Sequence, residues 1–96
     1  MSGLAAAVQA AELGARVVCL ESTAAIGGMA GGVEGIFAVN SSMAKEQGIA
    51  VSVGELVRIE LEQNQYRNSS LGLHDMIEAS GDDIDWLAEQ GRSGRL

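Results

Sequence analysis

The sequence predicts a mostly helical chain of α/β type with one short strand. The alanine-rich stretch from Gly3 to Leu13 favours a helix, and Gly14 stands where a left-handed C-terminal cap belongs. Residues 16–20 (Arg-Val-Val-Cys-Leu) form the run of apolar and β-branched side chains that is typical of a strand buried on both faces. A helix, a strand and then a glycine-rich loop is the order of half a βαβ unit.

Serine residues predict where the following helices begin. Ser41 is expected to cap a short helix that ends at Gly48. Ser52 and Glu55 form an S-x-x-E capping box, which predicts a helix that runs to about Gln65. The side chains expected on the inner face of this second helix are Val53, Leu56, Val57 and Leu61.

The rest of the chain is expected to form two more helices. The first of these helices is expected over residues 70–79. The second is expected to begin at Ser80 and to end at Gly91. We therefore expect a single small domain with two parts. These are the helix, strand and glycine loop of residues 1–39 and the helical region of residues 40–96.

Composition predicts a thin core. The hydrophobic fraction of 47% contains much alanine, and only 3% of the 96 residues are aromatic, so each side chain buries little area. An apolar strand without a neighbour would also present an unpaired edge to another chain. We therefore expect a homo-oligomer, most simply a two-fold dimer.

Charge and cysteine content exclude several classes of protein. The net charge is −7 and the six Lys and Arg residues are scattered, so the chain lacks the basic face that nucleic acids require. No apolar run approaches the roughly 20 residues of a membrane-spanning helix. The single cysteine, Cys19, excludes an internal disulfide and indicates a reducing, cytoplasmic compartment.

Glycine is concentrated between residues 22 and 35. The five glycines there are Gly27, Gly28, Gly31, Gly32 and Gly35. Such a density indicates either a flexible surface loop or backbone that lies close against a ligand. Both interpretations remain open on composition alone.

Two residues fit the end of a dinucleotide-binding fingerprint. Gly3 occupies the position of the third glycine of G-x-G-x-x-G, which lets the helix pack closely. Glu21 then ends the predicted strand, where an acidic residue accepts hydrogen bonds from the ribose hydroxyls. The first strand and the first two glycines of that motif are expected before Met1.

Longer stretches resemble the flavoprotein family of fumarate reductase and succinate dehydrogenase. The resemblance covers residues 3–21 (GLAAAVQAAELGARVVCLE) and the loop Ala-Ile-Gly-Gly at 25–28. It continues through Glu-Gly-Ile-Phe-Ala-Val at 34–39 and Ser-Gly-Asp-Asp-Ile-Asp-Trp-Leu-Ala-Glu-Gln-Gly at 80–91. The chain is thereby similar to a truncated, Rossmann-like FAD-binding domain.

The resemblance implies a cofactor and a reaction for the intact protein. FAD would exchange hydride with a small-molecule substrate, an alkene or alkane resembling a dicarboxylate. The residues implied in cofactor binding are Gly3, Glu21, Ser22, Gly27, Gly28 and Gly35. Met29 and Ala30 stand where many members have Asn and Thr, so flavin contacts from those side chains are not expected.

The chain alone is expected to bind FAD weakly or not at all and to catalyse nothing. The family's substrate-binding and proton-donating residues would follow residue 96, so we predict no catalytic residue here. The alternative function is a non-enzymatic, self-associating helical module. A nicotinamide-binding module is less favoured, because the loop at 25–28 resembles that of a flavoprotein.

No metal site is predicted. His74 is the only histidine and is expected at an exposed or core-edge position. Asp82, Asp83 and Asp85 are interpreted as charges at a helix start, because no EF-hand spacing accompanies them. Cys19 lies within the apolar run and is expected to be a buried, inert thiol.

Overall fold

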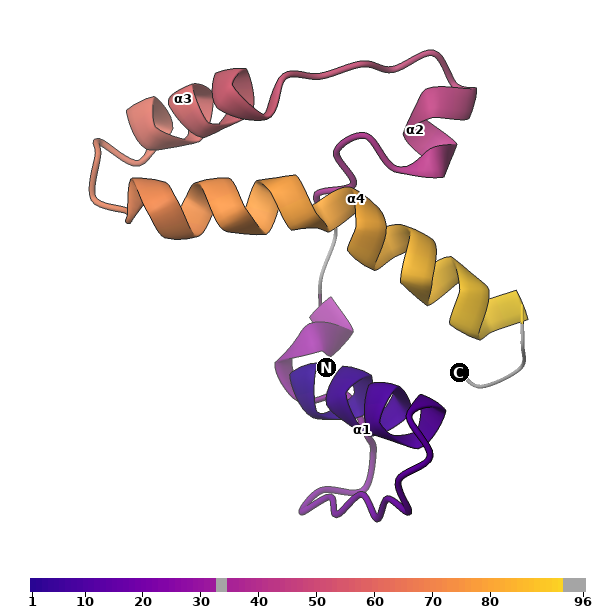
Figure 1. Cartoon of the computed structure of the whole chain (residues 1–96). Coiled ribbons are helices and arrows are strands. Elements are labelled where there is room, and N and C mark those ends of the chain that lie inside the picture. Colours follow the sequence, from indigo (N-terminus) through magenta and orange to yellow (C-terminus); the bar gives the residue numbers. More distant parts are fainter. Residues whose placement is uncertain (33–34, 93–96) are drawn as a thin grey trace. The chain divides into compact units, whose positions relative to one another are not determined.

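The computed structural model describes residues 1–32 and 35–92, and the regular elements within them are helices (Figure 1). Four α-helices and one 3-10 helix are described: α1 (Ser2–Glu12), η1 (Gly28–Gly32), α2 (Ser42–Glu46), α3 (Val53–Gln63) and α4 (Ser70–Arg92). The chain divides into two compact units, Met1–Ile36 and Phe37–Leu96. The resembling segment at 34–39 is described only from Gly35 onward, and the tail beyond Arg92 lies outside the described residues.

The predicted helical character is confirmed, but the α/β class is wrong. No strand occurs in the two described ranges, and residues 16–20 are irregular backbone. Val18 and Leu20 are 83% and 93% exposed. Strand preference reflects packing against paired neighbours more than an intrinsic backbone tendency. An apolar, β-branched run therefore remains irregular when no described segment forms a ladder with it.

The first helix ends as the sequence predicts. Gly14 has a φ of +89°, a conformation that favours glycine. Its N–H donates to the carbonyl of Ala11 (3.0 Å), and the N–H of Ala15 donates to the carbonyl of Ala10 (3.0 Å). These two bonds form a Schellman motif, which satisfies carbonyls that the end of the helix leaves open.

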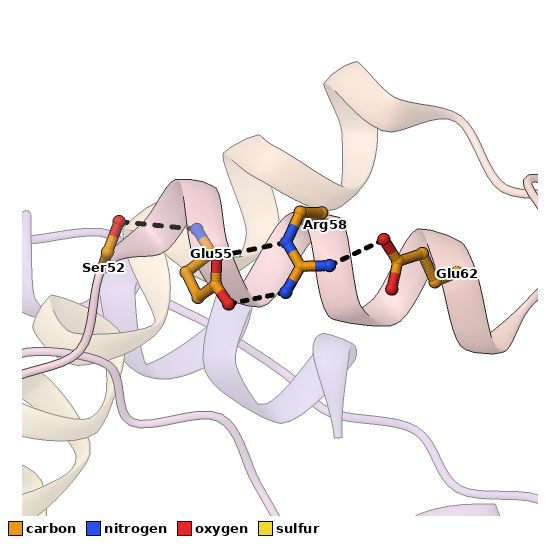
Figure 2. Close-up of polar contacts among 4 residues, drawn as sticks. All are labelled: Ser52, Glu55, Arg58 and Glu62. Atoms are coloured by element: carbon orange, nitrogen blue, oxygen red, sulfur yellow. Dashed lines mark hydrogen bonds and ion pairs between the residues drawn. The ribbon is translucent and has the colours of Figure 1, made fainter.

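The predicted N-caps of α2 and α3 are confirmed. The Ser41 hydroxyl accepts from the Ala44 N–H (3.2 Å), and the Ser52 hydroxyl accepts from the Glu55 N–H (3.4 Å). Figure 2 shows that the Glu55 carboxylate binds Arg58. Two guanidinium nitrogens reach it at 2.6 and 3.1 Å, and a third reaches Glu62 at 2.6 Å. This exposed chain of charges spans two turns of α3.

α3 and α4 run antiparallel and pack against each other (Figure 1). The predicted inner face of α3 is confirmed, because Val53, Leu56, Val57 and Leu61 are all half-buried. The apolar side chains that are fully buried in the described ranges are Val39 and Ile77. The prediction of a thin core is therefore confirmed.

One continuous helix replaces the two predicted over residues 70–91. Ser80 does not open a helix but lies inside α4, where its hydroxyl donates to the Ile77 carbonyl (2.7 Å) and accepts from the Val39 N–H (3.1 Å). Ser69 caps α4 instead, accepting from the Gly72 N–H (3.2 Å). Figure 1 shows α4 changing direction near its middle, as a Ser-Gly pair inside a helix favours.

The segment before α2 lies directly against α4 at Gly81. A Cβ atom on Gly81 would lie 2.2 Å from the Val39 carbonyl oxygen and 2.9 Å from the Ser41 nitrogen. Asp85 holds the same segment, because its carboxylate oxygens each accept from the Ser42 N–H at 3.0 Å. The Ser42 hydroxyl also donates to Asp85 (2.8 Å). Asp85 thus supports the start of α2 rather than that of its own helix.

Replacing Gly81 with alanine should destabilise the chain. The added methyl group meets backbone atoms that cannot move cheaply, and such overpacking costs about 1–3 kcal/mol. Urea unfolding followed by circular dichroism measures this loss. Gly72→Ala in the same helix is the matched control, because its Cβ would approach only Ser69 atoms at 3.6 Å and beyond. There we expect a gain of up to about 1 kcal/mol, and equal effects of both changes would contradict the close approach.

Replacing Arg58 with methionine should raise the pKa of Glu55. The hydrogen bond from Arg58 and then its charge hold that pKa below the ordinary value of 4.5. Because the folded-state pKa is lowered, the pair stabilises the fold above pH 4.5 and loses this effect as the pH falls through the lower value. A carboxyl-detected NMR titration measures the change. Arg67→Met should leave the Glu55 pKa where it is, and an unchanged pKa in Arg58→Met would contradict the pairing.

Candidate functional site

The unit formed by residues 1–36 contains an open cavity of about 650 Å³, whose lining residues are all exposed or half-buried. Its volume lies within the range of small-molecule and cofactor sites, roughly 300–1,000 Å³. Three segments line it: residues 1–10, which include most of α1, the irregular backbone of residues 17–21, and residues 26–30 of the glycine loop. The lining residues are Met1, Gly3, Leu4, Ala6, Ala7, Ala10, Val17, Val18, Cys19, Leu20, Glu21, Ile26, Gly27, Gly28, Met29 and Ala30.

The beginning of α1 provides polar backbone groups at one side of this cavity. Met1 is the N-cap, it makes no side-chain capping bond, and the first turn contains no acidic residue. The first N–H groups and the helix dipole therefore favour an anion or an electron-rich group there. Gly3 lies in this turn, and open space surrounds the position where its Cβ would be.

Gly27 and Gly28 leave their backbone open to a ligand on another side of the cavity. Gly27 and Gly28 have φ values of +117° and +55°, which side-chain-bearing residues rarely adopt. A Cβ atom added at either glycine would have no neighbouring atom within 4 Å, so the backbone at both positions faces open space. A ligand can approach both peptide units without meeting a side chain at these positions.

Glu21 provides the carboxylate of the cavity wall. Its Oε1 accepts from the Thr23 N–H (2.8 Å), from the Thr23 hydroxyl (3.0 Å) and from the Ser22 hydroxyl (3.4 Å). The Thr23 N–H, followed by the Thr23 hydroxyl, holds the pKa of the Glu21 carboxyl below its ordinary value. Glu21 is therefore an ionised acceptor at neutral pH, suited to hydroxyl donors.

The groups around the cavity suit hydroxyl donors better than phosphates. The carboxylate of Glu21 accepts hydrogen bonds, and most of the other lining side chains are apolar. No lining residue in the described part of the chain is Lys or Arg. The start of α1 is therefore the feature here that would favour a phosphate.

The predicted site residues are only partly brought together. Gly3, Glu21, Gly27 and Gly28 all line the cavity, whereas Ser22 contacts it only through its bond to Glu21. Gly35 is exposed and lies outside the lining.

The structure adds a contact of Thr23 that was not predicted and corrects the prediction for Cys19. Thr23 contacts Glu21 through two groups, and the sequence signal for it is a threonine two residues after an acid. Cys19 is exposed and lines the cavity, so the prediction of a buried thiol is wrong. Burial of Cys19 depended on the strand that does not form.

A second group of polar side chains lies on α4. His74 Nδ1 is 3.6 Å from Asp75 and 3.7 Å from Glu78, and one ligand atom of each lies within 4.8 Å of the others. The sequence analysis considered only His74 and missed Glu78, which stands one helical turn after it. His74 is half-buried and both carboxylates are exposed, and exposed acidic groups are common where no metal ion is bound. Each helix in the described ranges is too short or too polar to span a lipid bilayer.

Comparison with known proteins identifies related sequences. The family described as FAD dependent oxidoreductase matches residues 1–83. A vinyl phenol reductase of Lactiplantibacillus plantarum is 37% identical over 90 residues, which is 94% of this chain and 18% of that protein. The chain thus spans less than a fifth of the length of this curated relative. No solved structure matches the chain.

Proposed function

Because the chain belongs to the family of FAD-dependent oxidoreductases, we propose that it contributes part of the FAD site of an alkene reductase. The observation that carries this proposal is the gathering of Gly3, Glu21, Gly27 and Gly28 around one cavity. When bound, FAD would supply the hydride for reduction. The residues of this chain would hold its adenosine half, with Glu21 accepting from the ribose and the α1 amides facing phosphate.

The proposed substrate is a small molecule with a carbon–carbon double bond. The relative from Lactiplantibacillus plantarum is named for a vinyl phenol, which contains such a bond. The resemblance to fumarate reductases supports the same reaction class, because fumarate also is an alkene. We assign no catalytic residue of this reaction to residues 1–96. The free thiol of Cys19 supports a cytoplasmic location.

We further propose that the isolated chain binds FAD weakly and does not turn over substrate. The cavity wall contains an ionised carboxylate, its described lining has no Lys or Arg, and the chain carries a net charge of −7. A helix start contributes only about 0.3–1 kcal/mol for an exposed anion. This cannot supply tight binding of a negatively charged dinucleotide.

Added FAD should therefore bind with a dissociation constant well above micromolar, detected by NMR titration of the backbone amides. The perturbed amides should be those of Gly3, Glu21, Gly27 and Gly28, and Glu21→Gln should weaken binding about tenfold because it removes a charged acceptor. Arg67→Met, in the other unit, is the control. Submicromolar affinity by calorimetry would overturn weak binding, and perturbations confined to α3 and α4 would overturn the site.

A second candidate function is self-association, and a specific observation favours it. Val18, Leu20 and Met29 are 83%, 93% and 98% exposed in the described structure. Exposed apolar side chains that gather around one cavity favour association, and the core of the chain is thin. We propose a homodimer in which residues of the first unit bury this surface. Such a dimer needs no cofactor.

Sedimentation equilibrium at micromolar concentration should then show a dimer. Val18→Glu should give a monomer, because it places a charge within the exposed apolar segment. Met76→Glu changes an exposed apolar residue of α4, at 51% exposure, and should leave the dimer intact. A folded, monomeric wild-type chain at this concentration would rule the dimer out.

A further inference from the structure

Among the described residues, the hydrogen bonds that hold the Glu21 carboxylate all end on one of its two oxygens. All three of its short-range bonds end on Oε1: those from the Thr23 N–H (2.8 Å), the Thr23 hydroxyl (3.0 Å) and the Ser22 hydroxyl (3.4 Å). The second oxygen, Oε2, takes part in none of these bonds. An ionised carboxylate can accept hydrogen bonds at both oxygens. In this arrangement Oε1 binds the protein's own donors, and Oε2 can accept a hydrogen bond from a ligand.

Thr23 makes the two shorter of these contacts. Its hydroxyl also lies 2.8 Å from the Ala25 carbonyl, so its single proton is shared between Glu21 and the loop that leads to Gly27. A β-branched side chain has few χ1 rotamers, which limits how far this hydroxyl can move. Thr23 therefore connects the orientation of the carboxylate with that of the glycine loop, and both line the same cavity through Glu21 and Gly27.

We propose that Thr23 is a positioning residue, which fixes Oε1 of Glu21 so that Oε2 is kept for a hydroxyl of the bound nucleotide. This inference rests on the proposed function, in which Glu21 accepts from the ribose of FAD. The lowered pKa of Glu21 agrees with it, because the donors on Oε1 stabilise the charged form. Thr23 acts through Glu21 and need not touch the ligand.

A pair of nucleotides tests this role without any catalysis. ADP carries the ribose 2′-hydroxyl and 2′-deoxy-ADP lacks it, so the ratio of their dissociation constants, measured by NMR titration, reports the contact with Glu21. A hydrogen bond to a charged group predicts a ratio of about tenfold or more in the wild-type chain. Glu21→Gln should bring the ratio close to one.

The Thr23 variants separate positioning from simple stabilisation. Thr23→Val keeps the shape and the N–H but removes the hydroxyl, and it should reduce the nucleotide ratio about threefold or more. Thr23→Ser keeps the hydroxyl and should restore most of the ratio. In the nucleotide-free chain, Thr23→Val should also raise the pKa of Glu21 in a carboxyl NMR titration. Arg16 and Cys19 are the other ionisable side chains close to Glu21 in sequence, and both are unchanged in these variants.

Two different failures are distinguishable. If Thr23→Val leaves both the nucleotide ratio and the Glu21 pKa unchanged while the wild-type ratio is high, the positioning role is wrong and the ribose contact stands. If the wild-type chain does not discriminate between the nucleotides, the proposed ribose contact is wrong and the positioning role falls with it. The pKa measurement then still shows whether the Thr23 hydroxyl bonds to Glu21.

Discussion

The contact between residues 39–42 and the middle of α4 is the interaction on which the helical unit depends. Val39 and Ile77, the two buried apolar side chains of the described structure, lie in the contacting segments, and the Ser80 hydroxyl joins Val39 to Ile77. This contact requires Gly81, because a Cβ there would overlap the Val39 carbonyl. With so little apolar area buried, hydrogen bonds and close backbone packing carry a large share of the specificity.

Helix ends show which parts of the fold the sequence determines locally. Gly14 and Gly48 each close a helix with the same pair of hydrogen bonds, and glycine at that position is a local signal that sequence reasoning detects. α3 ends with the same bonds around Gln65, at a φ of +53°. A non-glycine residue in that conformation gives no sequence signal, so the predicted end of α3 came two residues late.

The wrong predictions concern features that depend on contacts between distant residues. Ser80 and the acidic residues after it form a typical N-cap pattern, yet Ser80 lies in the middle of α4. Its hydroxyl accepts a hydrogen bond from the N–H of Val39, 41 residues earlier, and a contact over that separation cannot be predicted from local sequence. Residues 16–20 have a strand composition, but a strand exists only through its partner. Gly3, Glu21 and Gly27 were predicted from their spacing along the chain and do line one cavity, but their role in binding a cofactor stays a prediction. The contact of Thr23 with Glu21 was missed because it depends on the rotamer of Glu21.

The charge of the cavity limits what it can recognise. In the proposed site, an ionised Glu21 would attract the hydroxyl donors of a ribose and repel a phosphate on the same sugar, so it would favour FAD-like or NAD-like nucleotides over 2′-phosphorylated ones. The same charge disfavours the pyrophosphate that every such nucleotide carries. A carboxylate can therefore give selectivity at this position only if its orientation is fixed and the phosphates are held by other groups. Within the described residues, the proposal assigns the phosphates to the α1 amides and the fixing of Glu21 to Thr23. Selectivity for the sugar and affinity for the phosphates would then arise from different parts of the site, and the second would be the weaker of the two.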